Sequence, residues 1–280
     1  MKQIINHFTD NDLYTFTCMY YILQKYPRAE VEYTFFDRNK TKYPIGFDEI
    51  LQEQMNGMAN VVITEEEIEF MKKKCYFLPH WYIDTFLRGY RFNPKELTIS
   101  QDEEGYLDIK VKGKWWSAIF WEMPILSTIS ELMHIIKGDI DNYNAELEYD
   151  RSLEKAKKAL TNGLTISDMG TRRRLSFDHQ DMVVKSFKEV QNQSWPNLTG
   201  KFVGTSNVYF AMKYDLTPIG TMSHQIISFE ENVSGIFECN HNVMNKWSDT
   251  YDSNLGVFLY DCFGDHVFFN NLSRKMAMLF

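Results

Sequence analysis

Three polar turns between Ser167 and His224 carry the residues that could bind anions and transfer a phosphoryl group. Each turn follows a short apolar or mixed segment, and two of them contain Gly-Thr, as strand-to-helix junctions often do. Such junctions gather at one end of the sheet in α/β folds, where ligands bind. The turns read Ser-Asp-Met-Gly-Thr-Arg-Arg-Arg-Leu-Ser (167–176), Phe-Val-Gly-Thr-Ser-Asn (202–207) and Leu-Thr-Pro-Ile-Gly-Thr-Met-Ser-His-Gln (216–225).

The first turn ends in three adjacent arginines, Arg172, Arg173 and Arg174. A guanidinium group offers a planar fork of donors that binds carboxylate or phosphate through two hydrogen bonds. Neighbouring side chains at a strand end alternate in direction, so all three cannot face one pocket. We therefore expect one or two of them to meet an anionic ligand and the rest to pair with surface acids.

The other turns add backbone donors and titratable groups. Residues 204–207, Gly-Thr-Ser-Asn, could bind an anion through N–H groups at a helix N-terminus, although Ser and Asn are also ordinary helix caps. His224 could act as a base, a metal ligand or a phosphoryl acceptor. Asp261 follows an apolar segment and could meet Mg²⁺-bound phosphates or a ribose hydroxyl, or cap a helix. For Glu122 and Glu131 we expect a structural role.

Composition narrows the class of protein. The 280 residues are 44% hydrophobic with a net charge of −8, so the arginines are a local feature and no nucleic-acid partner is expected. The sequence contains no run of about 18 apolar residues, so no membrane partner is expected. The N-terminus lacks a signal-peptide core. The four cysteines are scattered without metal-ligand spacing, which favours reduced thiols in a cytoplasmic protein and no metal-ligating side chains.

Residues 1–145 are predicted to form an N-terminal α+β domain. Period-3.6 and capping signals predict helices, and alternating apolar residues predict strands. Asp10 or Asp12 can cap the first helix, and Thr64 with Glu67 forms a capping-box pattern. The expected helices are 10–25, 64–74, 79–90, 124–136 and 143–160, and the expected strands are 31–35, 97–100, 106–111 and 115–121.

Residues 146–280 are predicted to form the first part of an α/β barrel, because strands and helices alternate there. The expected strands are 164–169, 202–203 and 255–261, and the expected helices are 178–191, 207–214 and 266–274. The last residues, Met276 to Phe280, read as a buried strand that simply stops. This ending suggests a fragment of a longer protein, or a sheet that another chain completes.

The motifs resemble those of the nicotinate phosphoribosyltransferase family, and the similarity is collinear over nearly the whole chain. The matching segments are Asp12-Leu13-Tyr14, Arg91-Phe92-Asn93-Pro94, Trp121-Glu122-Met123-Pro124-Ile125-Leu126, Ile129-Ser130-Glu131, Gly170-Thr171-Arg172-Arg173-Arg174, Gly204-Thr205-Ser206-Asn207, Thr217-Pro218-Ile219-Gly220-Thr221 with His224, and Leu259-Tyr260-Asp261.

The resemblance implies a type II phosphoribosyltransferase fold, in which an N-terminal domain precedes an irregular α/β barrel; here the barrel would be incomplete. It implies a homodimer with shared active sites that joins nicotinate to 5-phosphoribosyl 1-diphosphate. The products would be nicotinate mononucleotide, in the salvage route to NAD, and diphosphate. ATP hydrolysis would drive the reaction through a phosphohistidine, with Mg²⁺ present.

Carried over by motif, His224 would be the catalytic, phosphorylated residue. Tyr14 would stack on the nicotinate ring from the partner subunit, and Arg172 would contact the substrate carboxylate or the phosphoribosyl group. Asp261 would lie near the ribose or metal. Three further residues would line the pyridine pocket: Gly204, Thr205 and Ser206.

The chain also departs from the family pattern. Met169 stands where relatives often carry Phe, and its thioether could pack on the other ring face. Residues 262–266 read Cys-Phe-Gly-Asp-His, whereas relatives more usually have a Thr-aromatic pattern with a later Asp. An Arg-His-Asp-Ser-Gly-Asp-Pro segment and glycine-rich phosphate loops that follow in the family are missing. We therefore expect the 280-residue chain to be inactive alone.

Two alternatives stay open. One is a sister enzyme for nicotinamide or quinolinate; an acidic residue in place of Ser206 would favour the amide, and quinolinate enzymes need no ATP. The other is a non-catalytic, truncated subunit that binds nucleotides or a partner.

Overall fold

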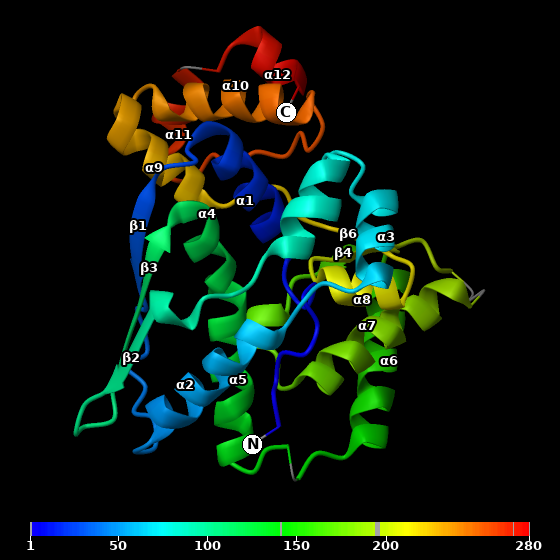
Figure 1. Cartoon of the computed structure of the whole chain (residues 1–280). Coiled ribbons are helices and arrows are strands. Elements are labelled where there is room, and N and C mark those ends of the chain that lie inside the picture. Colours follow the sequence, from blue (N-terminus) through cyan, green and yellow to red (C-terminus); the bar gives the residue numbers. More distant parts are fainter. Residues whose placement is uncertain (1, 141, 194–196, 271, 280) are drawn as a thin grey trace.

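The described residues form two small sheets surrounded by helices, which makes the protein a mixed α/β fold as predicted (Figure 1). The structure is a computed structural model that describes residues 2–140, 142–193, 197–270 and 272–279. The first sheet is built from residues 30–114 and the second from residues 165–218. The division into domains at residue 145 lies between them and stays a prediction.

The first part of the chain alternates helices and antiparallel strands. The predicted capping box forms at α3, where the Thr64 side chain accepts from Glu67 N and the Glu67 carboxylate accepts from Thr64 N. The predicted aromatic helix at 79–90 is centred on η2, a π-helix. The elements are α1 (Leu13–Lys25), β1 (Glu30–Thr34), α2 (Phe47–Gly57), η1 (Met58–Asn60), α3 (Glu65–Lys74), η2 (Tyr82–Leu87), η3 (Pro94–Glu96), β2 (Leu97–Gln101) and β3 (Leu107–Lys114).

The first sheet is antiparallel with the order β1-β3-β2. Tyr33 on β1 lies opposite Val111 on β3, and Ile99 on β2 lies opposite Ile109. Ile109 and Val111 are buried, whereas Asp108 and Lys112 on either side of them are exposed and Lys110 between them is half-buried, so one face of the sheet covers the core. That apolar face also forms one wall of the cavity described below.

The predicted strand at 115–121 is wrong. The residues form α4 (Trp115–Ala118) and η4 (Ile119–Trp121), which lead directly into α5 (Glu122–Ile136). Aromatic and β-branched residues favour strands locally, but every residue of this run except Trp116 is buried and burial does not alternate, so tertiary packing decides its structure. By length and composition alone, the run Trp115–Ile136 could cross a bilayer. However, 56% of its most apolar 18-residue stretch is buried inside the protein, as in the core helix of a folded domain.

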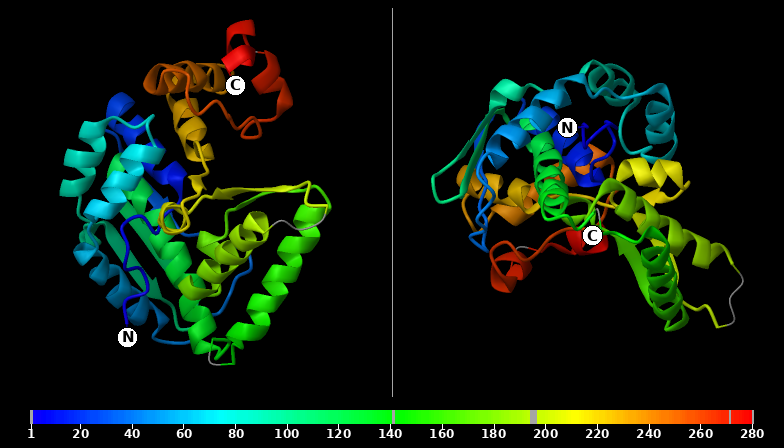
Figure 2. Two further views of the ribbon diagram at one scale, coloured as in Figure 1. Left: turned by 90° about the vertical axis from the view of Figure 1, so that its right-hand side faces the viewer. Right: turned by 90° about the horizontal axis from the view of Figure 1, so that it is seen from below.

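The second part contains a parallel sheet with the order β4-β5-β6, as the strand-helix alternation predicted. Helices α6 and α7 lie side by side at the end of the molecule opposite α10 and α12 (Figures 1 and 2). The elements are α6 (Ala145–Thr161), β4 (Thr165–Asp168), η5 (Thr171–Arg173), α7 (Phe177–Asn192), β5 (Lys201–Thr205), α8 (Val208–Lys213), β6 (Thr217–Pro218), α9 (His224–Ser234), α10 (Cys239–Tyr251), α11 (Asp265–Asn270) and α12 (Arg274–Leu279).

Two predicted strands near the C-terminus are wrong. Residues 255–261 form no strand, and none of the described strands pairs with them. The segment predicted as a buried final strand lies largely in α12, where Met276 is buried and Met278 is 78% exposed. An apolar composition without a regular burial pattern favours neither helix nor strand, so tertiary packing decides that this segment is helical. Phe280 lies outside the described residues.

The segment before α1 joins the two parts of the fold. Asp12 forms an antiparallel bridge with Asn207, and Leu13 N donates to Ser206 O over 2.8 Å. Tyr209 N donates in turn to Thr9 O, and the Tyr209 ring stacks on His7 with centroids 3.8 Å apart. These contacts place the beginning of α1 beside the end of β5.

Candidate active site

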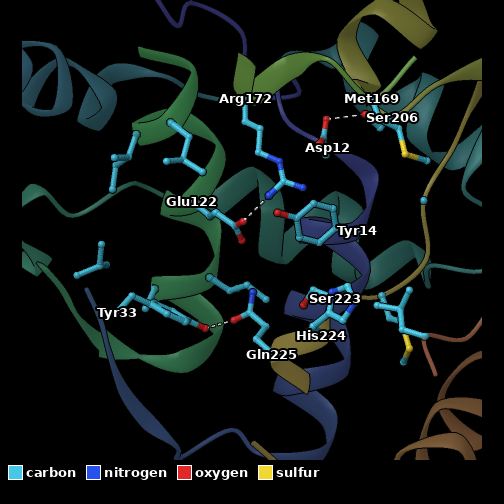
Figure 3. A pocket seen from close by; sticks show the side chains of 18 of the residues that line it. Asp12, Tyr14, Tyr33, Glu122, Met169, Arg172, Ser206, Ser223, His224 and Gln225 are labelled. Carbon is cyan, nitrogen blue, oxygen red and sulfur yellow. Dashed lines mark hydrogen bonds and ion pairs between the residues drawn. The ribbon is translucent and has the colours of Figure 1, made fainter. Parts of the chain in front are cut away.

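One cavity of about 760 Å³ lies where the beginnings of α1, α5 and α9 meet the ends of β1, β4 and β5. Figure 3 shows polar side chains pointing into it from elements far apart in the sequence. Four of the predicted site residues line it: Tyr14, Arg172, Ser206 and His224. The convergence of imidazole and guanidinium groups on a shared cavity, expected from the turns, is present.

His224 is the first residue of α9, and its side chain is 56% exposed. Its Nε2 lies 2.9 Å from Oδ1 of Asp261. The hydrogen bond from His224 lowers the pKa of Asp261, so this carboxylate is ionised and accepts the Nε2 proton. The Nδ1 lone pair is then free to act as a nucleophile. Asp261 itself does not line the cavity but holds the histidine from outside.

The neighbouring Gln225 fixes the start of α9 against the first sheet. Its Oε1 accepts from Tyr33 Oη, and Trp115 Nε1 donates to Tyr33 Oη over 2.7 Å. Both aromatic partners belong to the first part of the fold, and Trp115 precedes Gln225 by 110 residues. The position of His224 therefore depends on contacts between segments that are distant in the sequence.

Of the three arginines, Arg172 lines the cavity. Its Nη1 lies 3.4 Å from Oε1 of Glu122, and both groups are partly exposed (Figure 3). Tyr14 points toward the same pair, and burial together with the charge of Glu122 raises the Tyr14 pKa well above its ordinary value. Glu122, for which we expected a structural role, therefore belongs to the cavity. Its place in the Trp-Glu-Met-Pro motif was the signal that could have indicated this.

Arg174 is buried and faces away from solvent. Its guanidinium group donates to both oxygens of Asp10 over 2.8 and 3.0 Å, and its Nε lies 3.3 Å from Glu131. Burial raises the Glu131 pKa, and the charge of Arg174 opposes this effect. Glu131 thus has the structural role expected for it. Arg173 is exposed, so the triplet divides into one cavity residue, one surface residue and one core residue.

Asp12 is a second cavity residue that the sequence reasoning missed, since we read it as a helix cap. It occupies the N-cap position of α1 but makes no cap hydrogen bond. Its Oδ1 instead accepts from Thr171 Oγ1 and Ser206 Oγ, each over 2.8 Å. Burial raises the Asp12 pKa from 3.8 to about 6. Its position directly before Leu13-Tyr14 in a matching motif was the available signal.

Gly204 and Thr205, which we expected in the pyridine pocket, do not line the cavity. A Cβ on Gly204 would meet the Thr217 carbonyl oxygen at 2.0 Å, so glycine is needed for close approach of β6. The Thr205 hydroxyl donates to Asp168 Oδ2 over 2.7 Å, a contact between β5 and β4. Both residues therefore shape the sheet rather than the cavity surface.

The expectation of free backbone donors at residues 204–207 is wrong. Ser206 N donates to Asp168 O, and Val208 N, the first of α8, donates to Asn11 O. Asn207 N lies 3.2 Å from Thr205 Oγ1. The segment before α1 covers this helix terminus, so its N–H groups are used within the protein.

Met169, which we expected near the substrate ring, lines the cavity and is 60% exposed. The described residues contain no group of three or more His, Cys, Asp or Glu side chains that could hold a metal ion.

Comparisons with known proteins identify the family. A family model described as the nicotinate phosphoribosyltransferase (NAPRTase) N-terminal domain matches residues 9–130, and one described as the nicotinate phosphoribosyltransferase (NAPRTase) family matches residues 164–280. Two relatives named nicotinate phosphoribosyltransferase come from Desulforapulum autotrophicum and Methanosarcina mazei. The first is 34% identical and the second 33%; each alignment covers 99% of this chain, and 69% or 70% of the relative.

The fold is similar to a solved structure as well. The crystal structure of nicotinate phosphoribosyltransferase from Porphyromonas gingivalis superposes with a TM-score of 0.89 at 35% identity, covering 99% of this chain and 69% of that one. The resemblance predicted from the motifs is confirmed by these matches, and so is the predicted relation to the type II phosphoribosyltransferase fold.

Proposed function

The chain belongs to the nicotinate phosphoribosyltransferase family, and we propose that it joins nicotinate to 5-phosphoribosyl 1-diphosphate, giving nicotinate mononucleotide and diphosphate for NAD salvage. The observation that carries the proposal is the single cavity that Tyr14, Arg172, Ser206 and His224 line together. It combines an aromatic ring, a guanidinium group, a buried hydroxyl and an imidazole.

Arg172 is the residue proposed to hold the nicotinate carboxylate. It is a cation in the cavity whose partner, Glu122, is only partly buried, so an incoming carboxylate can take over the guanidinium donors. Tyr14 and Met169 both line the cavity and offer surfaces on which a pyridine ring can stack. Phosphoribosyl transfer passes through an oxocarbenium-like state, so such positioning and electrostatic stabilisation provide most of the catalysis.

His224 is proposed to be the phosphoryl acceptor. Its Nδ1 attacks the γ-phosphorus of ATP, the N–P bond forms, and the bond to the leaving oxygen of ADP breaks. The Nε2 proton stays in its hydrogen bond with Asp261, which stabilises the positive charge on the ring. The phosphohistidine adds about two negative charges at the cavity wall and so changes the affinity for diphosphate.

Mg²⁺ is proposed to arrive with the phosphate-bearing substrates, because Mg²⁺ is commonly held by one or two carboxylates together with substrate phosphates. The described residues do not form a metal cage of their own, so no residue of the chain is assigned to the ion. A homodimer with shared sites and a cytoplasmic location complete the proposal. Both are carried over from the family resemblance. The cavity described here is lined by the chain's own Tyr14, whereas the resemblance implied a Tyr14 from the partner subunit.

The test of the reaction mixes the protein with labelled nicotinate, phosphoribosyl diphosphate and Mg²⁺, with and without ATP. Nicotinate mononucleotide is the expected product, and ATP should increase its yield. Labelled nicotinamide or quinolinate in place of nicotinate tests the sister activities. Calorimetric binding of nicotinate is measured in parallel. Binding without turnover would favour the non-catalytic subunit. The absence of both binding and turnover would exclude the proposal.

The role of His224 is tested separately. Incubation with γ-labelled ATP should give acid-labile, alkali-stable label, and His224→Ala should abolish it together with the stimulation by ATP. His266→Ala is the matched control, because His266 is exposed and lies outside the cavity. Label that persists in His224→Ala would assign the phosphoryl group to another residue.

A further inference from the structure

The carboxylate of Asp12 uses only one of its two oxygens within the protein. Oδ1 accepts from both Thr171 and Ser206, whereas Oδ2 has no hydrogen-bond donor among the described residues. The residue is only 4% exposed, yet it lines the cavity (Figure 3). Oδ2 is therefore an unused acceptor at the cavity wall, and a ligand in the cavity can donate to it.

The charges around Asp12 define which ligand group fits. Asp168 on β4 raises the Asp12 pKa and Arg172 lowers it, but burial is the largest influence. Tyr14 on α1 and Glu122 on α5 also face this part of the cavity. An anionic group against Oδ2 would meet repulsion from both Asp12 and Asp168, so the ligand group must be a neutral or cationic hydrogen-bond donor.

The chemistry of the proposed substrates leaves one such donor. Nicotinate is an anion that offers only acceptors, its carboxylate oxygens and ring nitrogen, and the phosphate groups also accept. Neither substrate carries a cationic group, so the ribose hydroxyls are the donors that remain. Resting on the proposed function, we propose that Asp12 is a substrate-binding residue whose Oδ2 accepts a hydrogen bond from a ribose hydroxyl of 5-phosphoribosyl 1-diphosphate.

A magnesium ligand is the main competing role for this oxygen, and the Mg²⁺ dependence measured below distinguishes the two. Mg²⁺ demands octahedral coordination and usually keeps several waters, so it needs room for the hydrated ion beside the oxygen. Asp12 offers one oxygen from a side chain that is almost fully buried between Thr171 and Ser206. A ribose hydroxyl needs only that single acceptor. The negative charge would also stabilise the positive charge that develops on the ribose during transfer.

The test is a binding cycle by titration calorimetry without ATP, since ATP carries a ribose as well. Wild-type protein is titrated with phosphoribosyl diphosphate and with its 2-deoxy and 3-deoxy analogues. One analogue should bind roughly 10- to 100-fold more weakly than the parent, the range expected for a lost hydrogen bond to a charged group. In Asp12→Asn an NH₂ donor replaces the free acceptor oxygen, so the ratio of the affinities for parent and analogue should fall towards one.

Asp168→Asn is the matched control. Asp168 belongs to the same network and is also an aspartate, but both its oxygens accept hydrogen bonds from the protein and it does not line the cavity. Its replacement should leave the parent-to-analogue ratio unchanged. An unchanged ratio in Asp12→Asn would overturn the proposal, and so would a defect in Asp12→Asn that appears only with Mg²⁺ and equally for all three compounds.

A second measurement needs no variant. In wild-type protein the ratio should fall as the pH is lowered through about 6, because protonated Asp12 loses its charge. The phosphates titrate alike in all three compounds and cancel from the ratio. A ratio independent of pH would contradict the role of Asp12. Failure of the wild type to bind any of the three compounds would instead refute the proposed function itself.

Discussion

Arg174 and Asp10 form a buried two-pronged ion pair that ties the segment before α1 to the turn after β4. The two N–O distances are 2.8 and 3.0 Å, and the side chains are 1% and 0% exposed. Asn207 Nδ2 also donates to Asp10, over 2.7 Å. The pair therefore joins three segments next to the cavity, and the arrangement of the cavity depends on it.

Asp10→Asn should destabilise the protein by about 3–5 kcal/mol, because it leaves the buried Arg174 with an incomplete set of charged partners. The free energy of unfolding in urea, measured by circular dichroism, checks this. Arg173→Met is the control: Arg173 is exposed, so its loss should change stability by no more than about 0.5 kcal/mol. Equal effects of the two changes would show that the pair does not stabilise the fold.

Arg172→Met should weaken nicotinate binding roughly 10- to 100-fold, since a charged hydrogen bond to the carboxylate is lost. Glu122→Gln should act in the opposite direction, because it removes the anion that competes for Arg172. Calorimetric titration with nicotinate measures both. Tighter or unchanged binding in Arg172→Met would place the carboxylate elsewhere.

Asp261→Asn should slow phosphorylation of His224 by roughly 10-fold or more, because the ionised acceptor that holds the Nε2 proton is replaced by a neutral amide. The rate of label transfer from γ-labelled ATP is the measurement. Asp265→Asn serves as the control, an exposed aspartate at the start of α11 that does not line the cavity. Equal rates in both variants would argue against a role for the Asp261 contact.

The raised pKa of Asp12 predicts a pH-dependent cost to stability. The folded state holds the proton more tightly than the unfolded state, so the protonated acid stabilises the fold below pH 4, and this stabilisation is lost as the pH rises through about 6. A change from 3.8 to about 6 corresponds to about 3 kcal/mol. Asp12→Asn should therefore be as stable as wild type near pH 4 and more stable at pH 7. Urea titrations at both values test this, and a constant difference would contradict it.

Gly204→Ala should destabilise the protein by about 1–3 kcal/mol or more, because the new Cβ would meet the Thr217 carbonyl oxygen at 2.0 Å and push β6 away from β5. Gly89→Ala is the matched control. A Cβ on Gly89 would meet no atom within 4 Å, so this helical and exposed position should tolerate alanine. Thermal unfolding distinguishes the two, and similar melting temperatures would rule out the close approach.

Local signals in the sequence determined much of the secondary structure. The capping box at Thr64, the alternation in β1 and β3, and the period of α7 depend on neighbours within one element, so they could be predicted. The run 115–121 and the segment after Asn254 could not. Their apolar residues are compatible with either state, and burial by distant parts of the chain decided between helix, loop and strand.

The family and the residue types of the site were also present in the sequence, in collinear motifs and in the turns that carry Arg172 and His224. Only the tertiary structure decided which members of each motif reach the cavity. Arg172 enters it while Arg174 is buried against Asp10, and Ser206 lines it while Thr205 faces Asp168. Asp12 and Glu122 join it as well. The direction of a side chain depends on contacts between residues distant in sequence, and no local pattern encodes those contacts.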